Sequence, residues 1–350
     1  MGARLQDVAT AAGVSVRTVS NVVNDFPHVA AGTRARVQAT IDELGYRPNL
    51  AARTLRRSRT GLVSLVVPEL DSPYFAELAA RIVAGAHSYG WTVLIDQTRG
   101  DEEHERRLIH GVRNQLVDGL IFSPWSVPPA ELLARTDDIA LVLLGEHGLE
   151  DPLDAGRFSR VVIDNVAAAQ EATAHLLAGG ARRIAAVGLQ PHLHNCTAHL
   201  RVRGYRAALS AAGIAPDPAL EVPVRALHRA DGAQAFGTLL DRLAGRGEKL
   251  DGAFFFTDEL ALGGIRAAVE RGLRVPTDLT VAGFDDIVDG RFSVPTLTTI
   301  APDKQGIADA ALRSLADQLA GSGAGVAVPA RHRLVVRESS TRRQADSVGR

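Results

Sequence analysis

The residues best suited to specific chemistry lie on one polar face near the N-terminus. Arg17, Asn21 and Asn24 follow one another at spacings of four and three, so they share one side of a helix. An arginine can donate two hydrogen bonds to a guanine, and the neighbouring Val16 can contact a thymine methyl group. The pattern predicts that Val16, Arg17 and Asn21 read base edges in the major groove of DNA.

Hydroxyl groups surround this face. Ser15, Thr18 and Ser20, together with Asn24, are the kind of side chain that binds DNA phosphates and so positions a protein without reading sequence. We therefore predict phosphate contacts for these four residues. The alternative is a small helical bundle whose polar face is incidental, and it stays open at this point.

A tight turn between two helices would hold this face in place. Apolar residues at positions 5, 8, 9 and 12 predict a short first helix, and Gly13 permits the turn that ends it. Ser15 can cap the second helix, in which the valines at 19, 22 and 23 face inward. These elements predict a helix-turn-helix, whose second helix enters the major groove.

A third helix would complete the unit. Its predicted buried stripe is Val37, Ile41 and Leu44, and Gly45 is its stop signal. Residues 1–60 contain nine arginines and four acidic residues, a net charge of +5, whereas the whole chain carries −1. The remainder therefore carries −6. A basic head on an acidic body indicates a polyanion partner for the head, although a solvated charged surface would give the same count.

At this point a family resemblance becomes specific. The segments LQDVATAAGVSVRTVSNVVN and TRARVQATIDELGYRPNLAARTLRR resemble the DNA-binding head and hinge of the LacI/GalR family of bacterial regulators. The resemblance implies paired hinge helices that form on a near-palindromic double-stranded operator. Leu55 would wedge into a minor-groove base step, with Ala52 beside it and Arg56 reaching groove or backbone. The alternative for Leu55 is a linker residue that packs against the body.

One position departs from the family pattern. The family usually opens its third helix with a serine cap, and this chain has Ala30 there. Loss of such a cap costs about 1 kcal/mol. Thr33 is the candidate cap one turn later.

After residue 60, short apolar runs alternate with amphipathic stretches. The helix expected within 75–89 has an apolar stripe at positions 75, 78, 79 and 82. Such alternation predicts an α/β body of two doubly wound parallel-sheet lobes. The runs that predict buried strands are 62–67, 91–95, 119–123, 139–144, 160–163, 183–187, 253–256 and 279–284.

The body also resembles the LacI/GalR family, whose effector domain is similar to periplasmic sugar-binding proteins. DSPYFAEL, RVRGYRAAL and RVPTDLTVAGFDD carry the likeness, in the family's order. The likeness implies chain crossings between the lobes near 162, 290 and 326. The expected boundaries are 1–48 for the helix-turn-helix, 49–60 for the hinge, 61–340 for the body (lobe 1 at 61–162 and 291–325, lobe 2 at 163–290 and 326–340) and 341–350 for a disordered tail.

Ligands of open α/β sheets bind beyond the carboxyl ends of the strands. A sugar-like ligand needs flat apolar surfaces, which Phe75 and Trp125 would supply, and a few convergent polar groups. Arg201 and Asp285 match effector-binding positions of the family. Asp258 has a competing role as a helix cap, and Trp125 as a core or dimer-face residue. The predicted effector site is Tyr74, Phe75, Trp125, Thr197, Arg201, Asp258 and Asp285.

Several classes of protein are disfavoured. Cys196 is the only cysteine, and the loop that carries it with His192, His194 and His199 matches no closed zinc site, so we expect no metal and no cofactor. The absence of nucleophile-elbow, P-loop, HExxH and dinucleotide motifs predicts that the chain is not an enzyme. No apolar run is long enough for a membrane span or a signal peptide, which predicts a cytoplasmic protein without a membrane partner.

These observations together predict a sequence-specific transcription regulator, a repressor that a sugar-like small molecule controls from between two lobes. The C-terminal residues TRRQADSVGR lack the leucine heptad of the family's tetrameric members, which implies a homodimer. Two alternatives from other classes are an exported sugar-binding protein and a small-molecule-modifying enzyme.

Overall fold

The computed structural model describes residues 3–23, 26–46, 59–110, 116–136, 139–145, 158–193, 197–323 and 325–341. The chain divides into two compact units, one before Gly61 and one from Gly61 onward. Asn24 and the hinge residues Ala52, Leu55 and Arg56 lie outside the described residues, as does the expected tail beyond residue 341. The roles predicted for them stay predictions.

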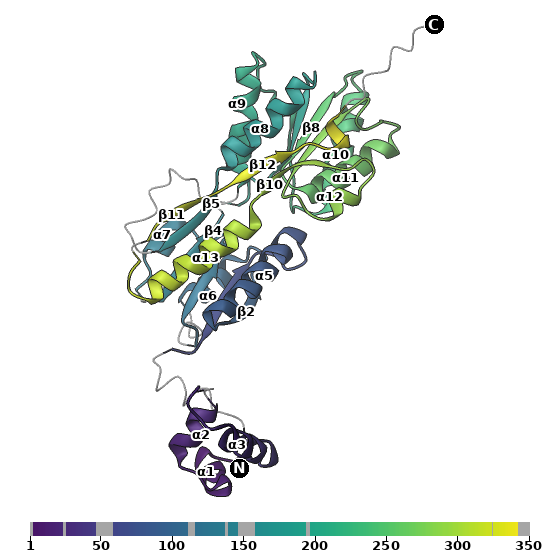
Figure 1. The fold of residues 1–350 in the computed structure, drawn as a ribbon. Coiled ribbons are helices and arrows are strands. Elements are labelled where there is room, and N and C mark those ends of the chain that lie inside the picture. Colours follow the sequence, from purple (N-terminus) through teal and green to yellow (C-terminus); the bar gives the residue numbers. More distant parts are fainter. Residues whose placement is uncertain are drawn as a thin grey trace. The chain divides into compact units, whose positions relative to one another are not determined.

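The described part of the first unit is a bundle of three helices (Figure 1). Val8, Val19 and Val37, one from each helix, are fully buried in its core. Gly13 ends the first helix with a φ of 64°, a left-handed conformation that costs glycine little. The predicted helical head is confirmed. Its helices are α1 (Leu5–Ala12), α2 (Val16–Val23) and α3 (Ala31–Glu43).

The two ends of α3 differ from the prediction. The helix begins at Ala31, directly after Ala30, whose side chain makes no capping hydrogen bond, so a start one turn later at Thr33 is wrong. Leu44, expected in the buried stripe, is 39% exposed. It lies beyond the last helical residue, where the helical spacing that buries Val37 and Ile41 no longer applies.

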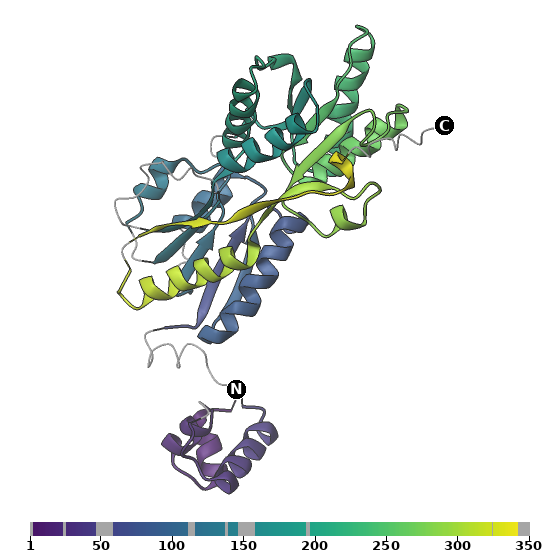
Figure 2. The ribbon, with the colours of Figure 1, turned by 45° about the horizontal axis from the view of Figure 1, so that its top comes forward.

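The second unit contains two six-stranded sheets (Figures 1 and 2). In the first sheet all neighbours are parallel, in the order β11-β5-β4-β3-β1-β2. In the second the order is β12-β10-β9-β8-β6-β7, and β12 runs antiparallel to β10. All eight predicted strands are present, which confirms the two-lobed α/β fold. The strands are β1 (Leu62–Val67), β2 (Thr92–Gln97), β3 (Gly119–Phe122), β4 (Ala140–Leu144), β5 (Ser159–Ile163), β6 (Ile184–Leu189), β7 (Glu221–Pro223), β8 (Gly252–Phe255), β9 (Thr280–Phe284), β10 (Thr298–Pro302), β11 (Ala327–Ala330) and β12 (His332–Val335).

Helices cover both faces of each sheet. In the first lobe, Leu65 and Val66 are successive residues of β1, yet they enter different cores, one under α5 and α13 and the other under α6. Burial on both faces is the reason why these strands appear as unbroken apolar runs. The second lobe has α8 and α9 on one face and α10 and α11 on the other. The helices are α5 (Pro73–Ala86), α6 (Glu102–His110), α7 (Pro129–Leu133), α8 (Asn165–Ala178), α9 (Ala198–Ala211), α10 (Arg229–Ala244), α11 (Asp258–Glu270), α12 (Asp289–Phe292) and α13 (Lys304–Leu319).

Two glycines bring α10 and α11 into backbone contact. A Cβ added to Gly232 would lie 2.3 Å from the carbonyl oxygen of Leu260, and one added to Gly263 would lie 1.9 Å from that of Arg229. Only glycine permits such an approach. The contact places the first turns of the two helices next to each other.

Three segments connect the lobes, at 163–165, 302–304 and 330–332. The first lies where the crossing near 162 was expected. The second lies well after 290, because β10 pairs with β9 and so remains in the second lobe. The third follows 326, because β11 still pairs with β5 of the first lobe. The expected lobe boundaries at 290 and 326 are corrected accordingly.

Candidate nucleic-acid interface and interlobe cavity

Helix α2 presents the predicted base-reading face. Ser15 caps the helix, since its Oγ accepts a hydrogen bond from the backbone N–H of Thr18 at 3.0 Å. Arg17 is exposed, and within the described part of the chain it makes no hydrogen bond or ion pair. Val16 and Asn21 are half-buried, and Val16 also packs against the core of the bundle. The guanidinium of Arg17 is therefore available to a partner.

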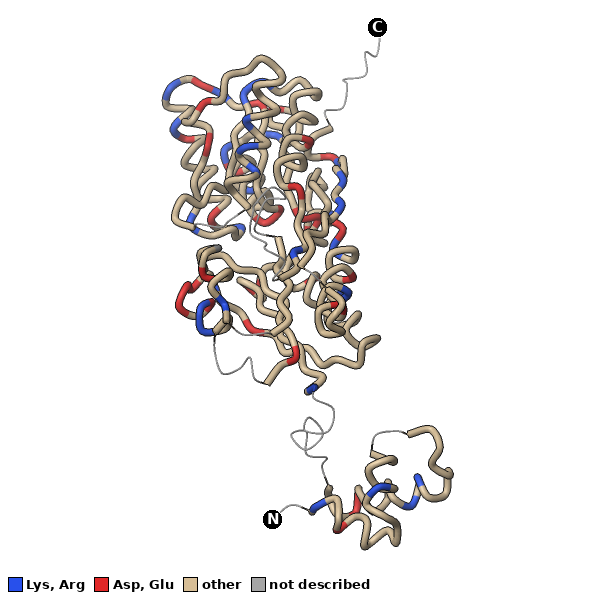
Figure 3. Tube along the Cα trace, turned by 90° about the vertical axis from the view of Figure 1, so that its left-hand side faces the viewer, with Lys and Arg blue, Asp and Glu red and all other residues tan. Residues whose placement is uncertain are grey.

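The residues predicted to bind phosphate lie close to this face. The hydroxyl oxygens of Ser15 and Thr18 are 2.9 Å apart, and Ser20 is half-buried one turn further on. In the body, basic and acidic positions are interspersed along the trace (Figure 3). The head, by contrast, has a net charge of +5 over residues 1–60, which a polyanion would favour.

A cavity lies between the two lobes, and its volume is about 60 Å³. Ligand pockets usually enclose at least roughly 300 Å³, so the lobes or their side chains must move to admit a sugar-sized molecule. Six of the seven predicted effector residues line the cavity. The first lobe contributes Glu69, Ser72, Tyr74, Phe75, Trp125, Gly145 and Ile163, and the second contributes Gln190, Thr197, Arg201, Leu227, Thr257, Glu259, Asp285 and Ile287.

Aromatic rings form the first-lobe wall of the cavity. The ring centroids of Phe75 and Trp125 are 6.2 Å apart at an edge-to-face angle of 64°, and those of Tyr74 and Phe75 are 5.2 Å apart. Phe75 comes from the first turn of α5 and Trp125 from the loop after β3. Trp125 is buried but borders the cavity, so it is not confined to the core. These rings provide the flat apolar surface that was expected.

Arg201 lies opposite, on α9, and its guanidinium is held firmly. Nε donates to Oδ1 of Asn165 at 2.9 Å, and one terminal nitrogen donates to the carbonyl oxygen of Phe256. The guanidinium carbon lies 3.6 Å from the centroid of the Phe284 ring, a cation–π contact. Thr197, which precedes α9, is half-buried beside it. These contacts fix the position of the Arg201 guanidinium at the cavity wall.

Asp285 ends β9 at the cavity wall in a strained conformation. Its φ is 114°, and that of Asp286 is 46°, values that L-residues rarely adopt. The side chain is 94% buried, and its carboxylate makes no hydrogen bond or ion pair with any described residue. Burial raises the pKa of Asp285 to about 7, against the opposing effect of Arg201. Strained backbone and carboxyl groups with shifted pKa values each cluster at functional sites.

Asp258 does not line the cavity and is not a helix cap. The cap of α11 is Thr257, whose Oγ1 accepts from the N–H of Leu260 at 3.2 Å. Asp258 is fully buried and accepts hydrogen bonds from Thr299 Oγ1 at 2.6 Å and from the N–H of Ile287 at 2.9 Å. Burial raises its pKa well above the ordinary value, and Asp285 adds to the shift. Its role is to join α11 to the loop after β9.

Two carboxylates of the cavity were missing from the prediction. Glu69 follows β1 and Glu259 lies in the first turn of α11, and burial raises the pKa of both. His228 lies between them, with Nε2 at 3.4 Å from Glu69 and Nδ1 at 3.8 Å from Glu259. Glu69 stands at the carboxyl end of a predicted strand, so the strand-end rule was the signal that could have found it.

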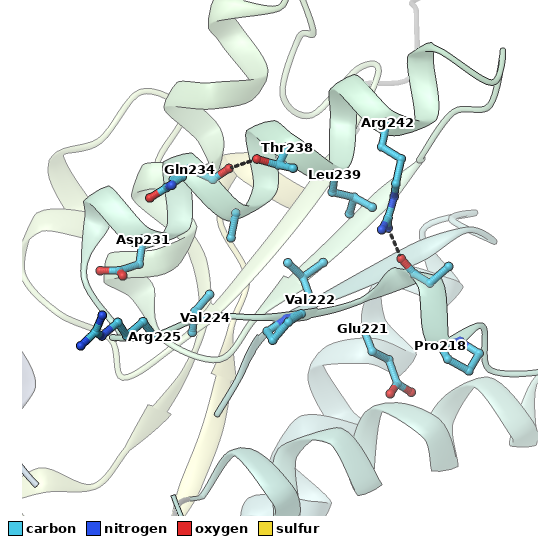
Figure 4. Close-up of a pocket in the computed structure, with 13 residues that line it drawn as sticks. Pro218, Glu221, Val222, Val224, Arg225, Asp231, Gln234, Thr238, Leu239 and Arg242 are labelled. Carbon is cyan, nitrogen blue, oxygen red and sulfur yellow. Dashed lines mark hydrogen bonds between the residues drawn. The ribbon is translucent and has the colours of Figure 1, made fainter. Parts of the chain in front are cut away.

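A larger groove of about 440 Å³ lies at the outer edge of the second lobe, between β7 and α10 (Figure 4). Its polar groups are engaged locally: Thr238 donates to the carbonyl oxygen of Gln234, and Arg242 donates to that of Ala219. All the residues that line this groove belong to the second lobe. The interlobe cavity is the better candidate despite its smaller size, because it joins strand ends of both sheets.

The described residues contain no group of three or more His, Cys, Asp and Glu side chains placed to hold a metal ion, and His194 and Cys196 lie outside them. None of their helices is long and apolar enough to cross a membrane.

Comparison with known proteins agrees with this geometry. Residues 4–49 match the family model of bacterial regulatory proteins, lacI family, and residues 173–340 match a periplasmic binding protein-like domain. The HTH-type transcriptional regulator DegA of Bacillus subtilis is 34% identical over 309 residues, which cover 86% of this chain and 87% of DegA.

Solved structures extend the likeness over nearly the whole chain. A complex of the transcriptional regulator CelR with cellobiose is 30% identical, with a TM-score of 0.71, and the match covers 96% of this chain and 99% of that one. A lac repressor dimer bound to operator and the anti-inducer ONPF is 26% identical, with a TM-score of 0.79 and coverage of 97% and 99%. This chain therefore belongs to the lacI family of bacterial regulatory proteins and is a DNA-binding transcriptional regulator.

Proposed function

We propose that this regulator is a cytoplasmic homodimeric repressor, and that a sugar-like molecule in the interlobe cavity switches its binding to a near-palindromic operator. The observation that carries the proposal is the cavity, in which aromatic rings of one lobe face polar groups of the other. Two relatives support it: CelR forms a complex with cellobiose, and the lac repressor dimer binds operator.

Each head reads one half of the operator. The exposed guanidinium of Arg17 contacts a base edge, because it stands at the start of the second helix, where a helix-turn-helix approaches the bases. Val16 and Asn21 add base contacts, and Leu55 wedges into the central step with Ala52 and Arg56 beside it. The proposed phosphate contacts are Ser15, Thr18, Ser20 and Asn24.

Exposed apolar side chains on both lobes support a homodimer. In the first lobe, Leu94 and Ile95 of β2 are 45% and 42% exposed. In the second, Phe292 is 81% exposed and Val294 91% exposed. Exposed apolar surface of this kind marks interaction sites, and a second copy of the chain would bury it. A dimer that uses both lobes also links the angle between the lobes of one chain to that of its partner.

The effector acts on this angle. Arg201 and Asp285 hydrogen-bond the ligand from the second lobe, while Phe75 and Trp125 cover it from the first. A ligand that binds the open and closed arrangements with different affinity shifts the equilibrium between them. Rotation of one lobe about the three connecting segments changes the spacing of the two hinges, and with it the affinity for operator.

Footprinting of the purified protein on genomic DNA would identify the operator for the test. Fluorescence anisotropy then compares the operator duplex with a scrambled duplex at fixed moderate salt, alone and with cellobiose, other sugars and nucleosides. We expect the operator to be bound at least about a thousandfold more tightly, and one compound to change that affinity. Equal affinity for both duplexes under every condition would refute the proposal. Turnover of a bound compound would favour an enzyme.

A further inference from the structure

Glu105 is a buried carboxylate that neither DNA reading nor ligand contact uses. It lies on α6 and is 0% exposed. A charged group buried in a protein core is costly unless hydrogen bonds satisfy its oxygens. The carboxylate of Glu105 therefore needs hydrogen-bond donors within the core.

Four donors surround this carboxylate. Oε1 accepts from Thr98 Oγ1 at 3.1 Å and from the backbone N–H of Trp125 at 2.9 Å. Oε2 accepts from the N–H of Ser126 at 2.9 Å and of Val127 at 2.8 Å. Three consecutive amides of one loop thus share one side chain as acceptor. Hydrogen bonds to a charged acceptor are about twice as strong as neutral ones.

The loop held in this way carries the aromatic wall of the cavity. Trp125 borders the cavity, and its ring packs against Phe75. On the other side, Ser126 Oγ donates to the carbonyl oxygen of Gly100 at 2.6 Å. A Cβ added to Gly100 would lie 3.4 Å from the Trp125 ring, so the backbone there closes against the indole. The indole is enclosed by its neighbours, while its backbone is fixed by Glu105.

We infer that Glu105 is a positioning residue that fixes Trp125 as a rigid wall of the interlobe cavity. A rigid ring needs no ordering when a ligand arrives, which favours ligands with a flat apolar face, such as a pyranose ring. The consequence for ligands rests on the proposed effector function of the cavity. The positioning itself does not, and it can be measured without a ligand.

The first test uses the full-length wild-type protein and hydrogen exchange. The amides of residues 125–127 lie outside every helix and strand, so an unsupported loop would exchange them rapidly. We expect exchange at least about a hundredfold slower than in an unstructured chain, because each amide is bonded to a buried carboxylate. Exchange at the rate of an open loop would overturn the inference.

The second test measures the environment of Trp125. The protein has two tryptophans, so Trp91→Phe leaves Trp125 as the sole reporter and keeps an aromatic ring at position 91. In this background Glu105→Gln should shift the emission to longer wavelength and increase quenching by acrylamide. An amide offers one acceptor oxygen in place of two, and its NH2 group faces backbone N–H donors. Unchanged emission and quenching would overturn the inference.

A matched control separates positioning from general destabilisation. Leu108 lies on the same helix and is buried, and its side chain has no group that can hydrogen-bond to the carboxylate of Glu105. Leu108→Ala should lower the melting temperature and leave the emission of Trp125 unchanged at temperatures well below melting. If it shifts the emission as much as Glu105→Gln does, the role of Glu105 is merely structural and the inference fails.

A milder variant covers the case in which Glu105→Gln does not fold. Thr98→Val removes one donor from Oε1 of Glu105 and should shift the emission of Trp125 in the same direction, but by less.

Failure of the proposed function is distinguishable from failure of this inference. If the loop is protected and Glu105→Gln releases Trp125, but no tested sugar binds the cavity, the positioning stands and the effector assignment falls.

Discussion

The ammonium Nζ of Lys304 lies 2.8 Å from Oε2 of Glu77, and each of the two side chains also makes a hydrogen bond to the backbone of the second lobe. Both residues belong to the first lobe, at the start of α13 and in α5. Lys304 also donates to the carbonyl oxygen of Asp286 at 3.2 Å, and Glu77 accepts from the N–H of Val288 at 3.3 Å. These backbone groups follow directly after Asp285 in the cavity wall. If the proposed effector moves Asp285, we expect it to disturb these hydrogen bonds between the lobes.

Removal of the cation from this pair should destabilise the body. Lys304→Met removes the nearer cation of Glu77 and leaves Arg81, at 3.8 Å, as its other cationic partner, so we expect a loss of about 2 kcal/mol in the free energy of unfolding. Urea denaturation measures it. The double variant Lys304→Met, Glu77→Gln should lose less than the sum of the single variants, because the two changes remove one shared interaction. Additive losses would contradict the coupling.

Arg17→Ala should weaken operator binding more than binding to scrambled DNA. Loss of a contact to a base costs about 1–3 kcal/mol at the specific site, whereas loss of one positive charge affects every sequence alike. Fluorescence anisotropy on both duplexes measures the difference. Arg36 of α3 is also exposed, so Arg36→Ala is the matched control and should weaken both duplexes by a similar factor. A similar loss on both duplexes for Arg17→Ala would remove its base-reading role.

Ionisation of the Asp285 carboxyl group should lower the free energy of unfolding as the pH rises. The pKa of this carboxyl is about 7 in the folded protein, above its ordinary value of 3.8. Between pH 4 and 7 the native state keeps a proton that the unfolded chain has released, so stability is present below about pH 4 and is lost as pH rises through 7. Asp285→Asn should be more stable than wild type at pH 8, by at most on the order of 4 kcal/mol, and should match it near pH 4.

Unfolding of ligand-free protein at pH 4, 6 and 8 checks this difference. Glu69 and Glu259, whose pKa values are also raised, are present in both proteins, so their contributions cancel in the comparison. A gain for Asp285→Asn that did not vary with pH would point to better packing and would contradict a titrating carboxylate.

Gly263→Ala should strongly destabilise the second lobe. The new methyl group would meet the carbonyl oxygen of Arg229 at 1.9 Å, and backbone cannot yield as a flexible side chain can. Overpacking of this kind costs about 1–3 kcal/mol or more. Gly245, where α10 ends, has its nearest contact at 3.5 Å and an ordinary φ of −61°, so Gly245→Ala is the control. Thermal unfolding should separate the two variants, and equal melting temperatures would refute the close approach.

The sequence by itself determined what depends on local spacing. The head was predictable from the apolar positions that include Val8 and Val19, from the turn at Gly13 and from the cap at Ser15. Each of these signals lies within a few residues of the helix that it defines. The eight predicted strands were predictable for a similar reason. Seven of them are largely buried on both faces and so show apolar runs, whereas β2 has an apolar run although it is partly exposed.

Only the tertiary structure decided the remaining strands and the membership of the site. β11 and β12 are partly exposed and β10 begins with threonines, so none of them shows an apolar run, and each is a strand because of a partner distant in sequence. Asp258 stands at a strand end, as Glu69 does. It is turned away from the cavity by Thr299, 41 residues further along the chain. Such pairings depend on how distant segments meet in space, which the spacing of neighbouring residues does not encode.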